Sequence, residues 1–305
     1  MKRALILVGP TAVGKTKLSL RLAHWLNGEV ISCDSMQVYR YLNIGTAKLM
    51  PEDREGIPHH LIDIRTIYQR YAVTDFIADA LRLIDQITAR GRLPIVVGGS
   101  NLYLQSLLDD FSFGGDRFKG FGLRKRLKYF AEMKGSVTLW KRLARVDPQS
   151  ARQIPHQNVR RVVRALEVYL RTGRQFSQQK LIRRKGINFL VIGLRTKRAL
   201  LYQRINRRVD VMMKAGLLTE AKWLFDCGGA ALPAGMGIGY HELYPYFKHQ
   251  ISLDRAVQLI KRDSRHYAKR QLTWFRNQMR VNWFDLIQNP QSVKSLRKLI
   301  VQWLR

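Results

Sequence analysis

Four short apolar runs occur in the first two thirds of the chain, and helical patterns separate the first three of them. Residues 4–8, 30–33, 94–97 and 189–194 have the length and composition of buried strands. Within residues 71–90, apolar side chains recur at the spacing of one helix face: Phe76, Ile77, Ala80, Leu81, Ile84 and Ile87. This alternation predicts an α/β fold with a doubly wound parallel sheet. In such sheets, ligands bind at the carboxyl ends of the strands.

A phosphate loop (P-loop) of the form G-x-x-x-x-G-K-[ST] follows the first strand. Its residues are Gly9, Pro10, Thr11, Ala12, Val13, Gly14, Lys15 and Thr16. Gly9 and Gly14 let the backbone curl, so that successive N–H groups and a helix N-terminus face one cavity. Lys15 can reach terminal phosphates and the Thr16 hydroxyl can hold Mg²⁺. The motif predicts a polyphosphate site without specifying the polyphosphate.

Residues 114–186 contain no comparable buried run. They are basic and helical in pattern, and glycine-containing turns at 113–115 and 185–186 bound them. We therefore predict a P-loop doubly wound parallel-sheet core, residues 1–113 and 187–305, with an inserted all-α basic domain at 114–186. After residue 194 the pattern predicts only helices.

Positive charge is concentrated in the second part of the chain. The net charge is +32, yet residues 1–113 hold 13 Lys/Arg against 11 Asp/Glu, whereas residues 114–200 hold 23 against 4. A polyanion docking on this part is the favoured explanation, and nucleic acid is the foremost candidate. A generally basic proteome or a membrane-surface protein is the alternative.

Cysteine usage and hydropathy predict a cytoplasmic protein. Cys33 and Cys227 are the only cysteines and show no C-x-x-C spacing, which suits a reducing compartment and argues against a structural zinc site. No apolar stretch approaches the roughly 20 residues that cross a bilayer.

Asp34 follows the second strand and offers a carboxylate at the strand end. Near a phosphate loop it could hold Mg²⁺ or act as a general base, and with Gln37 it could read an adenine edge. Alternatively, it caps the next turn. After the third strand, Gly98 and Gly99 stand where a hydrolysing NTPase would be expected to show an acid. Ser100 could donate to a leaving phosphate oxygen, or Ser100 or Asn101 could start a helix.

Arg208 lies on the apolar face of the helical pattern at 201–217, which also contains Leu201, Ile205, Val209 and Met212. An inward guanidinium needs an anion, which a bound diphosphate or an internal Asp or Glu could provide.

Two further helical patterns carry basic stripes. One pattern has an apolar face of Val159, Val162, Val163, Leu166 and Leu170, and Arg160, Arg164 and Arg171 fall on another face. Near the C-terminus, Arg262, Arg265, Lys269 and Arg276 share another stripe, among aromatic residues. Both stripes suit phosphate contacts, and a solvated helix face is the alternative for the first.

The order of these motifs resembles the tRNA dimethylallyltransferase family. The matching blocks are residues 9–16, 34–39, 56–61, 97–100, 158–169, 237–240 and 267–275. The resemblance implies transfer of a dimethylallyl group from dimethylallyl diphosphate to N6 of the adenosine 3′ of the anticodon, in tRNAs that read codons beginning with U. It also implies Mg²⁺ as cofactor and the tRNA anticodon stem-loop as partner. We expect a monomer, because a single tRNA could cover the basic surface.

The resemblance also implies residue roles. Residues 11–16 would cradle the diphosphate, Arg208 would clamp it, and Asp34 would take the proton from N6. With Lys15 and the Ser100 hydroxyl, which would assist the leaving group, these form the predicted catalytic set. The implied tRNA contacts are Asp34, Ser35, Met36 and Gln37 at the target base, and Gln157, Asn158, Val159, Arg160 and Arg161 in the insertion. The family usually has Gly-Gly-Thr-Gly where this chain has Gly98, Gly99, Ser100 and Asn101.

Two other functions fit the bare motifs. One is a P-loop kinase or NTPase acting on a nucleotide or RNA. The other is an RNA-binding module with a vestigial loop, which predicts RNA binding that does not depend on Lys15.

Overall fold

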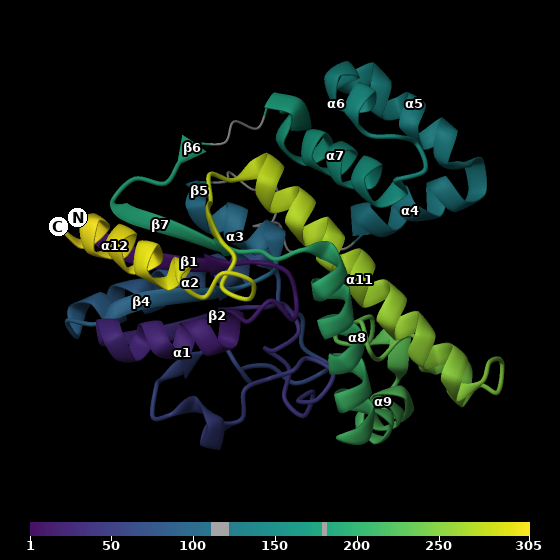
Figure 1. Cartoon of the computed structure of the whole chain (residues 1–305). Coiled ribbons are helices and arrows are strands. Elements are labelled where there is room, and N and C mark those ends of the chain that lie inside the picture. The colour runs from purple at the N-terminus through teal and green to yellow at the C-terminus, as the bar shows by residue number, and fades with distance from the viewer. Residues whose placement is uncertain (111–121, 179–181) are drawn as a thin grey trace. The chain divides into compact units, whose positions relative to one another are not determined.

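The structure is a computed structural model and describes residues 1–110, 122–178 and 182–305. It divides into two compact units (Figure 1): a core unit, Met1–Leu108 with Arg184–Arg305, and an insertion unit, Asp109–Arg183. The predicted boundary between residues 113 and 114 lies outside the described residues. The chain re-enters the core unit at Arg184, close to the predicted return at 187.

A six-stranded parallel sheet forms the centre of the core unit, in the order β3-β2-β4-β1-β7-β8. The strands are β1 (Lys2–Val8), β2 (Gly28–Cys33), β3 (His59–His60), β4 (Leu93–Gly98), β7 (Ile187–Leu194) and β8 (Asn282–Phe284). Leu5 of β1 pairs with Ile95 on one side and Leu190 on the other. Helices cover both faces, which explains why β1 reads as a continuous apolar run. The predicted doubly wound fold is confirmed.

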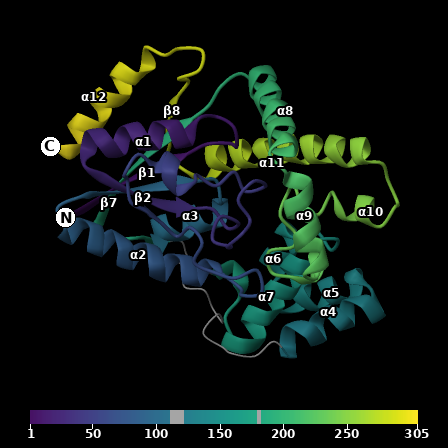
Figure 2. The same cartoon turned by 90° about the horizontal axis from the view of Figure 1, so that it is seen from below.

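Two apolar cores lie on opposite faces of this sheet (Figure 2). On one face pack α1 (Lys15–Leu26) and α12 (Ser292–Leu304), and on the other α2 (Val73–Ala89) and α3 (Asn101–Leu108). The remaining helices of the unit are α8 (Arg198–Lys214), α9 (Leu217–Asp226), α10 (Tyr244–Phe247) and α11 (Leu253–Gln278). Short 3₁₀ turns occur at Pro51–Arg54 and Gly229–Ala231. Because helices cover both faces of the sheet, the loops gather at the two edges formed by the strand ends, and the carboxyl ends of all six parallel strands lie at the same edge.

The prediction of helix alone after residue 194 is wrong, because β8 adds an edge strand at Asn282–Phe284. A strand of three residues is too short to show the period-two alternation that identifies strands in a sequence. The same holds for β3, which has two residues and pairs with β2 at the other edge.

The insertion unit is a small helical bundle with its own apolar core. Its helices are α4 (Gly122–Lys134), α5 (Ser136–Val146), α6 (Pro148–Gln153) and α7 (Val159–Thr172), followed by a 3₁₀ turn at Phe176–Gln178. One antiparallel ladder, β5 (Asp109–Asp110) with β6 (Ile182–Arg183), joins its ends and was not predicted. Leu170 was predicted on the apolar face of α7 but is 56% exposed, whereas Val162, Val163 and Leu166 are buried.

No helix in the described part of the chain combines the length and the apolar character needed to cross a membrane.

Candidate functional site

The phosphate loop connects β1 directly to α1. Gly9 and Gly14 adopt φ values of 148° and 104°, where side chains are rarely tolerated, and a Cβ on Gly9 would lie 2.7 Å from the Leu194 carbonyl oxygen. Ala12 is also left-handed, with φ 63°. The loop can therefore curl closely against the end of β7, and its backbone needs both glycines.

Two cations and one carboxylate converge beside this loop. Lys15 Nζ donates to the carbonyl oxygens of Gly9 and Pro10, at 2.8 Å each. Burial, and to a smaller extent the nearby Arg208, lower the pKa of Lys15 to about 7, while Asp34 acts in the opposite direction. Burial also lowers the pKa of Arg208, again opposed by Asp34. Among the described residues, two buried cations, Lys15 and Arg208, are thus balanced by only one nearby carboxylate, so binding of an anion at this place is favourable.

Arg208 reaches the loop from α8. Its Nη1 donates to Thr11 Oγ1 at 3.3 Å, and within the described ranges no carboxylate forms an ion pair with it. The internal-ion-pair alternative therefore has no support in this structure. A second arginine of α8, Arg204, donates from Nε to the Ala12 carbonyl oxygen at 2.8 Å, a contact that sequence reasoning missed.

Asp34 is half-buried at the end of β2 and divides its carboxylate between two environments. Oδ1 accepts hydrogen bonds from the backbone N–H groups of Met36 at 2.8 Å and Gln37 at 3.4 Å, so the capping role is present. Oδ2 receives no hydrogen bond from the described residues. The carboxylate is held in place by one oxygen and offers the other as a proton acceptor.

The turns after β2 and β4 lie against each other. A Cβ on Gly98 would lie 2.0 Å from the Cys33 carbonyl oxygen, so only glycine fits there. Ser100 immediately precedes α3, and its Oγ accepts the Ser35 backbone N–H at 3.2 Å. The predicted hydroxyl and the predicted base thus sit on neighbouring strand ends.

Gln37 is held by the protein itself. Its Oε1 accepts from Ser32 Oγ at 2.9 Å, and its Nε2 donates to the Thr46 carbonyl oxygen at 3.2 Å. These bonds orient the carboxamide and engage its N–H groups, and Oε1 keeps one lone pair for a further donor. Ser35 is exposed, and Met36 lies against Gly237.

Gln271 of α11 joins two turns of the site and was missed by sequence reasoning. It is 2% exposed; its Oε1 accepts the Thr11 N–H at 3.1 Å, and its Nε2 donates to the Gly99 carbonyl oxygen at 2.9 Å. A Cβ on Gly99 would lie 2.0 Å from that same Nε2. One loop amide is thereby committed to the protein. The only signal in the sequence was a glutamine within an aromatic and basic block.

The predicted tRNA contacts of the insertion surround the start of α7. Gln157, Arg160 and Arg161 are exposed, and Val159 packs partly into the unit's core. Asn158 caps the helix, because its side chain accepts the Arg161 N–H at 3.3 Å.

The predicted stripe of Arg160, Arg164 and Arg171 is not a uniform solvated face. Arg164 Nη1 lies 3.1 Å and Arg171 Nη2 3.6 Å from the carboxylate of Glu167, which is nearly buried. Arg124 Nη2 binds the same carboxylate at 2.5 Å. Glu167 therefore neutralises part of the stripe, and Arg160 remains an exposed cation.

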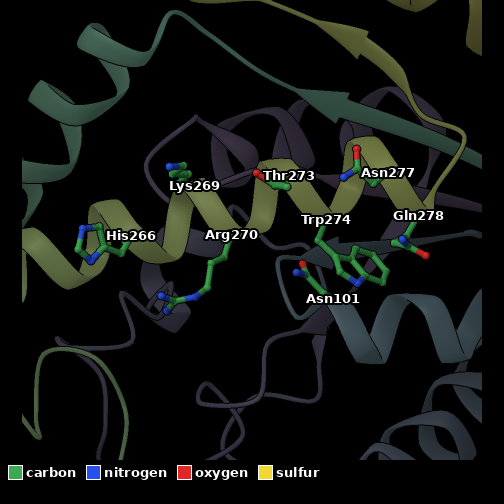
Figure 3. Close-up of a pocket in the computed structure, with 8 residues that line it drawn as sticks. All are labelled: Asn101, His266, Lys269, Arg270, Thr273, Trp274, Asn277 and Gln278. Carbon is green, nitrogen blue, oxygen red and sulfur yellow. The ribbon is translucent and has the colours of Figure 1, made fainter. Parts of the chain in front are cut away.

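The predicted stripe on α11 is likewise divided. Arg262 pairs with Asp263 at 2.8 Å and Arg265 donates to Asn206 at 2.7 Å, so both are engaged within the protein. Lys269 instead lines a cavity of about 660 Å³ (Figure 3). The other lining residues are Asn101, His266, Arg270, Thr273, Trp274, Asn277 and Gln278.

Two places have oxygen donors suited to a cation. The Thr16 hydroxyl is on the exposed side of the loop and forms no hydrogen bond with the described residues, which suits Mg²⁺ shared with substrate phosphates. Ligand atoms of His241, Glu242 and Asp263 lie within 4.8 Å of one another. There, Asp263 pairs with Arg262 within α11, and Glu242 accepts the Gly239 N–H of a nearby turn, so both carboxylates already have partners in the protein.

Comparison with known proteins identifies the family of the chain. Residues 37–278 match the family model described as IPP transferase. The chain belongs to the IPP transferase family. It is 52% identical over 307 residues to the tRNA dimethylallyltransferase of Limosilactobacillus reuteri (strain DSM 20016), covering all of both chains. It is also 52% identical over 305 residues to that of Ligilactobacillus salivarius (strain UCC118), covering 99% of each.

Solved structures agree with this family. The tRNA isopentenylpyrophosphate transferase of Bacillus halodurans has a TM-score of 0.75 at 43% identity, covering 100% of this chain and 97% of that one. A eukaryotic dimethylallyltransferase acting on tRNA has a TM-score of 0.80 at 29% identity, covering 98% and 78%. The family resemblance and the transferase class predicted from the motifs are confirmed, and a kinase has no comparable support.

Proposed function

We propose that this IPP transferase moves the dimethylallyl group of dimethylallyl diphosphate onto N6 of the adenosine 3′ of the anticodon, in tRNAs reading codons that begin with U. The observation that carries the proposal is the cluster of Lys15 and Arg208 at the phosphate loop, next to the unengaged oxygen of Asp34. Its cationic side suits a diphosphate leaving group, and its carboxylate suits an amine that must lose a proton.

The chemistry divides between the two sides of this cluster. The N6 amine is a weak nucleophile because its lone pair is delocalised into the ring, and Asp34 Oδ2 takes its proton as the N–C bond forms. As the allylic C–O bond breaks, the diphosphate takes the electron pair, and Lys15, Arg208 and the free loop amides stabilise its charge. The Ser100 hydroxyl, beside Ser35 on the neighbouring turn, can donate to a diphosphate oxygen.

Mg²⁺ fits the proposal, with Thr16 and the substrate diphosphate as its oxygen ligands. When bound, the ion supplies additional positive charge against the leaving group. The target base must leave its stack to reach a site at the strand ends, so base flipping is part of the proposal.

The exposed residues at the start of α7 support a role in gripping the anticodon stem. Gln157, Arg160 and Arg161 offer donors to phosphate oxygens, which position RNA without reading its sequence. The reducing environment suited to the free thiols Cys33 and Cys227 supports the cytoplasm as the site of action.

Nucleoside mass analysis of tRNA incubated with the enzyme, Mg²⁺ and dimethylallyl diphosphate tests the proposal. We expect one adenosine per substrate tRNA to gain the mass of a dimethylallyl group. Lys15→Ala should abolish the product, whereas Lys17→Ala, which removes an exposed neighbouring lysine, should not. Phosphate transfer from ATP to nucleotide or RNA, with no product from the allylic donor, would instead support a kinase.

A further inference from the structure

The carboxylate of Glu220 is occupied by donors from the protein itself. Glu220 lies in the first turn of α9, in the core unit (Figure 1). Its Oε2 accepts the backbone N–H groups of Asn43 at 2.8 Å and Ile44 at 2.9 Å. Its Oε1 accepts the N–H of Gly45 at 2.9 Å and the hydroxyl of Tyr240 at 2.7 Å. An ionised carboxylate has about four acceptor sites, so these four donors from the described residues take up its capacity.

Three successive backbone N–H groups, at residues 43–45, form a nest around this carboxylate. Such a nest is an anion-binding concavity. Its shape depends on Tyr240, which is fully buried: a Cβ on Gly45 would lie 2.5 Å from Tyr240 Cζ, so the position needs glycine. A glutamine in place of Glu220 would present an NH₂ group where donors already point. The nest therefore requires an anion rather than a polar side chain of the same shape.

The same loop carries the acceptors that hold Gln37. Thr46 directly follows Gly45, and its carbonyl oxygen accepts Gln37 Nε2 at 3.2 Å. The backbone N–H groups of Gln37 and Met36 in turn donate to Asp34 Oδ1, at 3.4 Å and 2.8 Å. A continuous path of peptide and hydrogen bonds thus runs from the nest to the carboxylate of the proposed base.

The loop also has turns of its own. The Ala47 N–H donates to the Ile44 carbonyl oxygen at 2.9 Å, and the Lys48 N–H donates to the Asn43 carbonyl oxygen at 3.0 Å. Lys48 Nζ donates to Asn43 Oδ1 at 3.0 Å. Because these bonds do not involve Glu220, its replacement should shift the loop rather than unfold it.

A surface cavity reaches Glu220. It has a volume of about 690 Å³, and its lining residues include Glu220, Tyr41, Ile44 and Trp223. Tyr41 is 70% exposed, so the cavity opens to solvent. Truncation of Glu220 would therefore leave the nest accessible to a small anion from solution.

We propose that Glu220 is a positioning residue of the transfer reaction. It fills the nest at residues 43–45, and the loop held in this way orients Gln37 and, through it, the carboxylate of Asp34. The role rests on the proposed function, because it requires Asp34 to be the base. Glu220 contacts neither substrate in this scheme, so its loss should slow the chemical step and leave substrate binding nearly unchanged.

Single-turnover transfer to tRNA at saturating dimethylallyl diphosphate tests this role. Glu220→Ala should lower the rate about 10- to 100-fold, because a displaced base loses its alignment with N6. The KM for each substrate should stay within about 3-fold of that of wild type. Formate should refill the nest of this variant and raise its rate at least about 3-fold, whereas formamide, the neutral analogue, should not. Glu220→Gln should be slow and should not respond to formate, because its carboxamide occupies the nest.

A double variant measures whether Glu220 acts through Gln37. Glu220→Ala combined with Gln37→Ala should be no slower than the slower single variant, because both changes break one path. Glu52→Ala is the matched control: it removes an exposed glutamate of the core unit and should transfer at the wild-type rate with or without formate. Circular dichroism establishes that each variant is folded.

The proposal is overturned if folded Glu220→Ala transfers at the wild-type rate, if its defect lies only in KM, or if formate and formamide act alike. Should Glu220→Ala not fold, a wild-type rate in Glu220→Gln overturns the proposal equally. Near-normal transfer by Asp34→Asn would refute Asp34 as the base, and no product from wild type would refute the proposed function. Normal transfer by Glu220→Ala beside a slow Asp34→Asn would refute the positioning role alone.

Discussion

Replacing Lys15 with methionine should change how the stability of the free protein depends on pH. Burial and Arg208 lower the pKa of Lys15 from 10.5 to about 7. The unfolded chain therefore binds more protons than the folded protein between these two values, and the stability of wild type rises with pH through that window. Below pH 7 the full cost of holding a charged Lys15 is present.

The magnitude follows from the same shift. At about 1.4 kcal/mol per pKa unit, Lys15 costs about 5 kcal/mol at pH 6 and about 2 kcal/mol at pH 9. Methionine removes this cost but leaves the carbonyl oxygens of Gly9 and Pro10 without a donor, a loss that does not depend on pH. The difference in unfolding free energy, variant minus wild type, should therefore fall by about 2–3 kcal/mol between pH 6 and pH 9.

Urea unfolding of both proteins at these two pH values measures the difference. Lys17→Met is the control, because this exposed lysine should show a difference that is the same at both pH values. Inorganic diphosphate should stabilise wild type more than Lys15→Met, because the bound anion interacts favourably with the protonated form of Lys15, which the variant lacks. A Lys15→Met difference that is constant from pH 6 to pH 9 would refute the argument.

Three further outcomes are expected. Asp34→Asn keeps an oxygen for the capping hydrogen bonds but removes the proton acceptor, so transfer should fall by about 10²- to 10⁴-fold with tRNA affinity within a few-fold; near-normal single-turnover rates would exclude Asp34 as the base. Gln271→Leu leaves two buried partners unpaired and should lower the unfolding free energy by about 2–4 kcal/mol in urea titrations; an unchanged midpoint would contradict that role. Arg160→Ala should reduce the slope of log Kd against log salt for tRNA by about 1, whereas Arg164→Ala, which removes one of the three arginines bound to Glu167, should mainly lower the thermal midpoint of the protein; equal effects on the slope would contradict this division of the stripe.

The elements with strong local patterns could be predicted from the sequence. The phosphate loop, its flanking strand and helix, and the four long strands follow from apolar runs and glycine spacing. The edge strands β3 and β8 could not, because two or three residues carry no periodicity and depend on pairing with distant strands.

The partners of polar side chains that are distant in the sequence could not be predicted. The helical spacing of Arg164 and Arg171 is correct, yet spacing cannot show that both bind the buried carboxylate of Glu167. Likewise, Gln37 looked free beside Asp34, but its partner Thr46 lies in an irregular segment with no predictable geometry. A count of basic residues along a sequence therefore overstates the number of arginines available to bind phosphate, because some of them form ion pairs within the protein.

The bridge made by Gln271 has a consequence for how the enzyme senses its substrates. One side chain joins helix α11 to the phosphate loop through Thr11 and to the glycine turn after β4 through Gly99. A shift of that helix would therefore displace Thr11 and Gly99 together, because both are bonded to the same side chain. Any tightening of the cradle by RNA must be matched by an equal tightening of RNA binding by the allylic donor, because linkage between ligands is reciprocal.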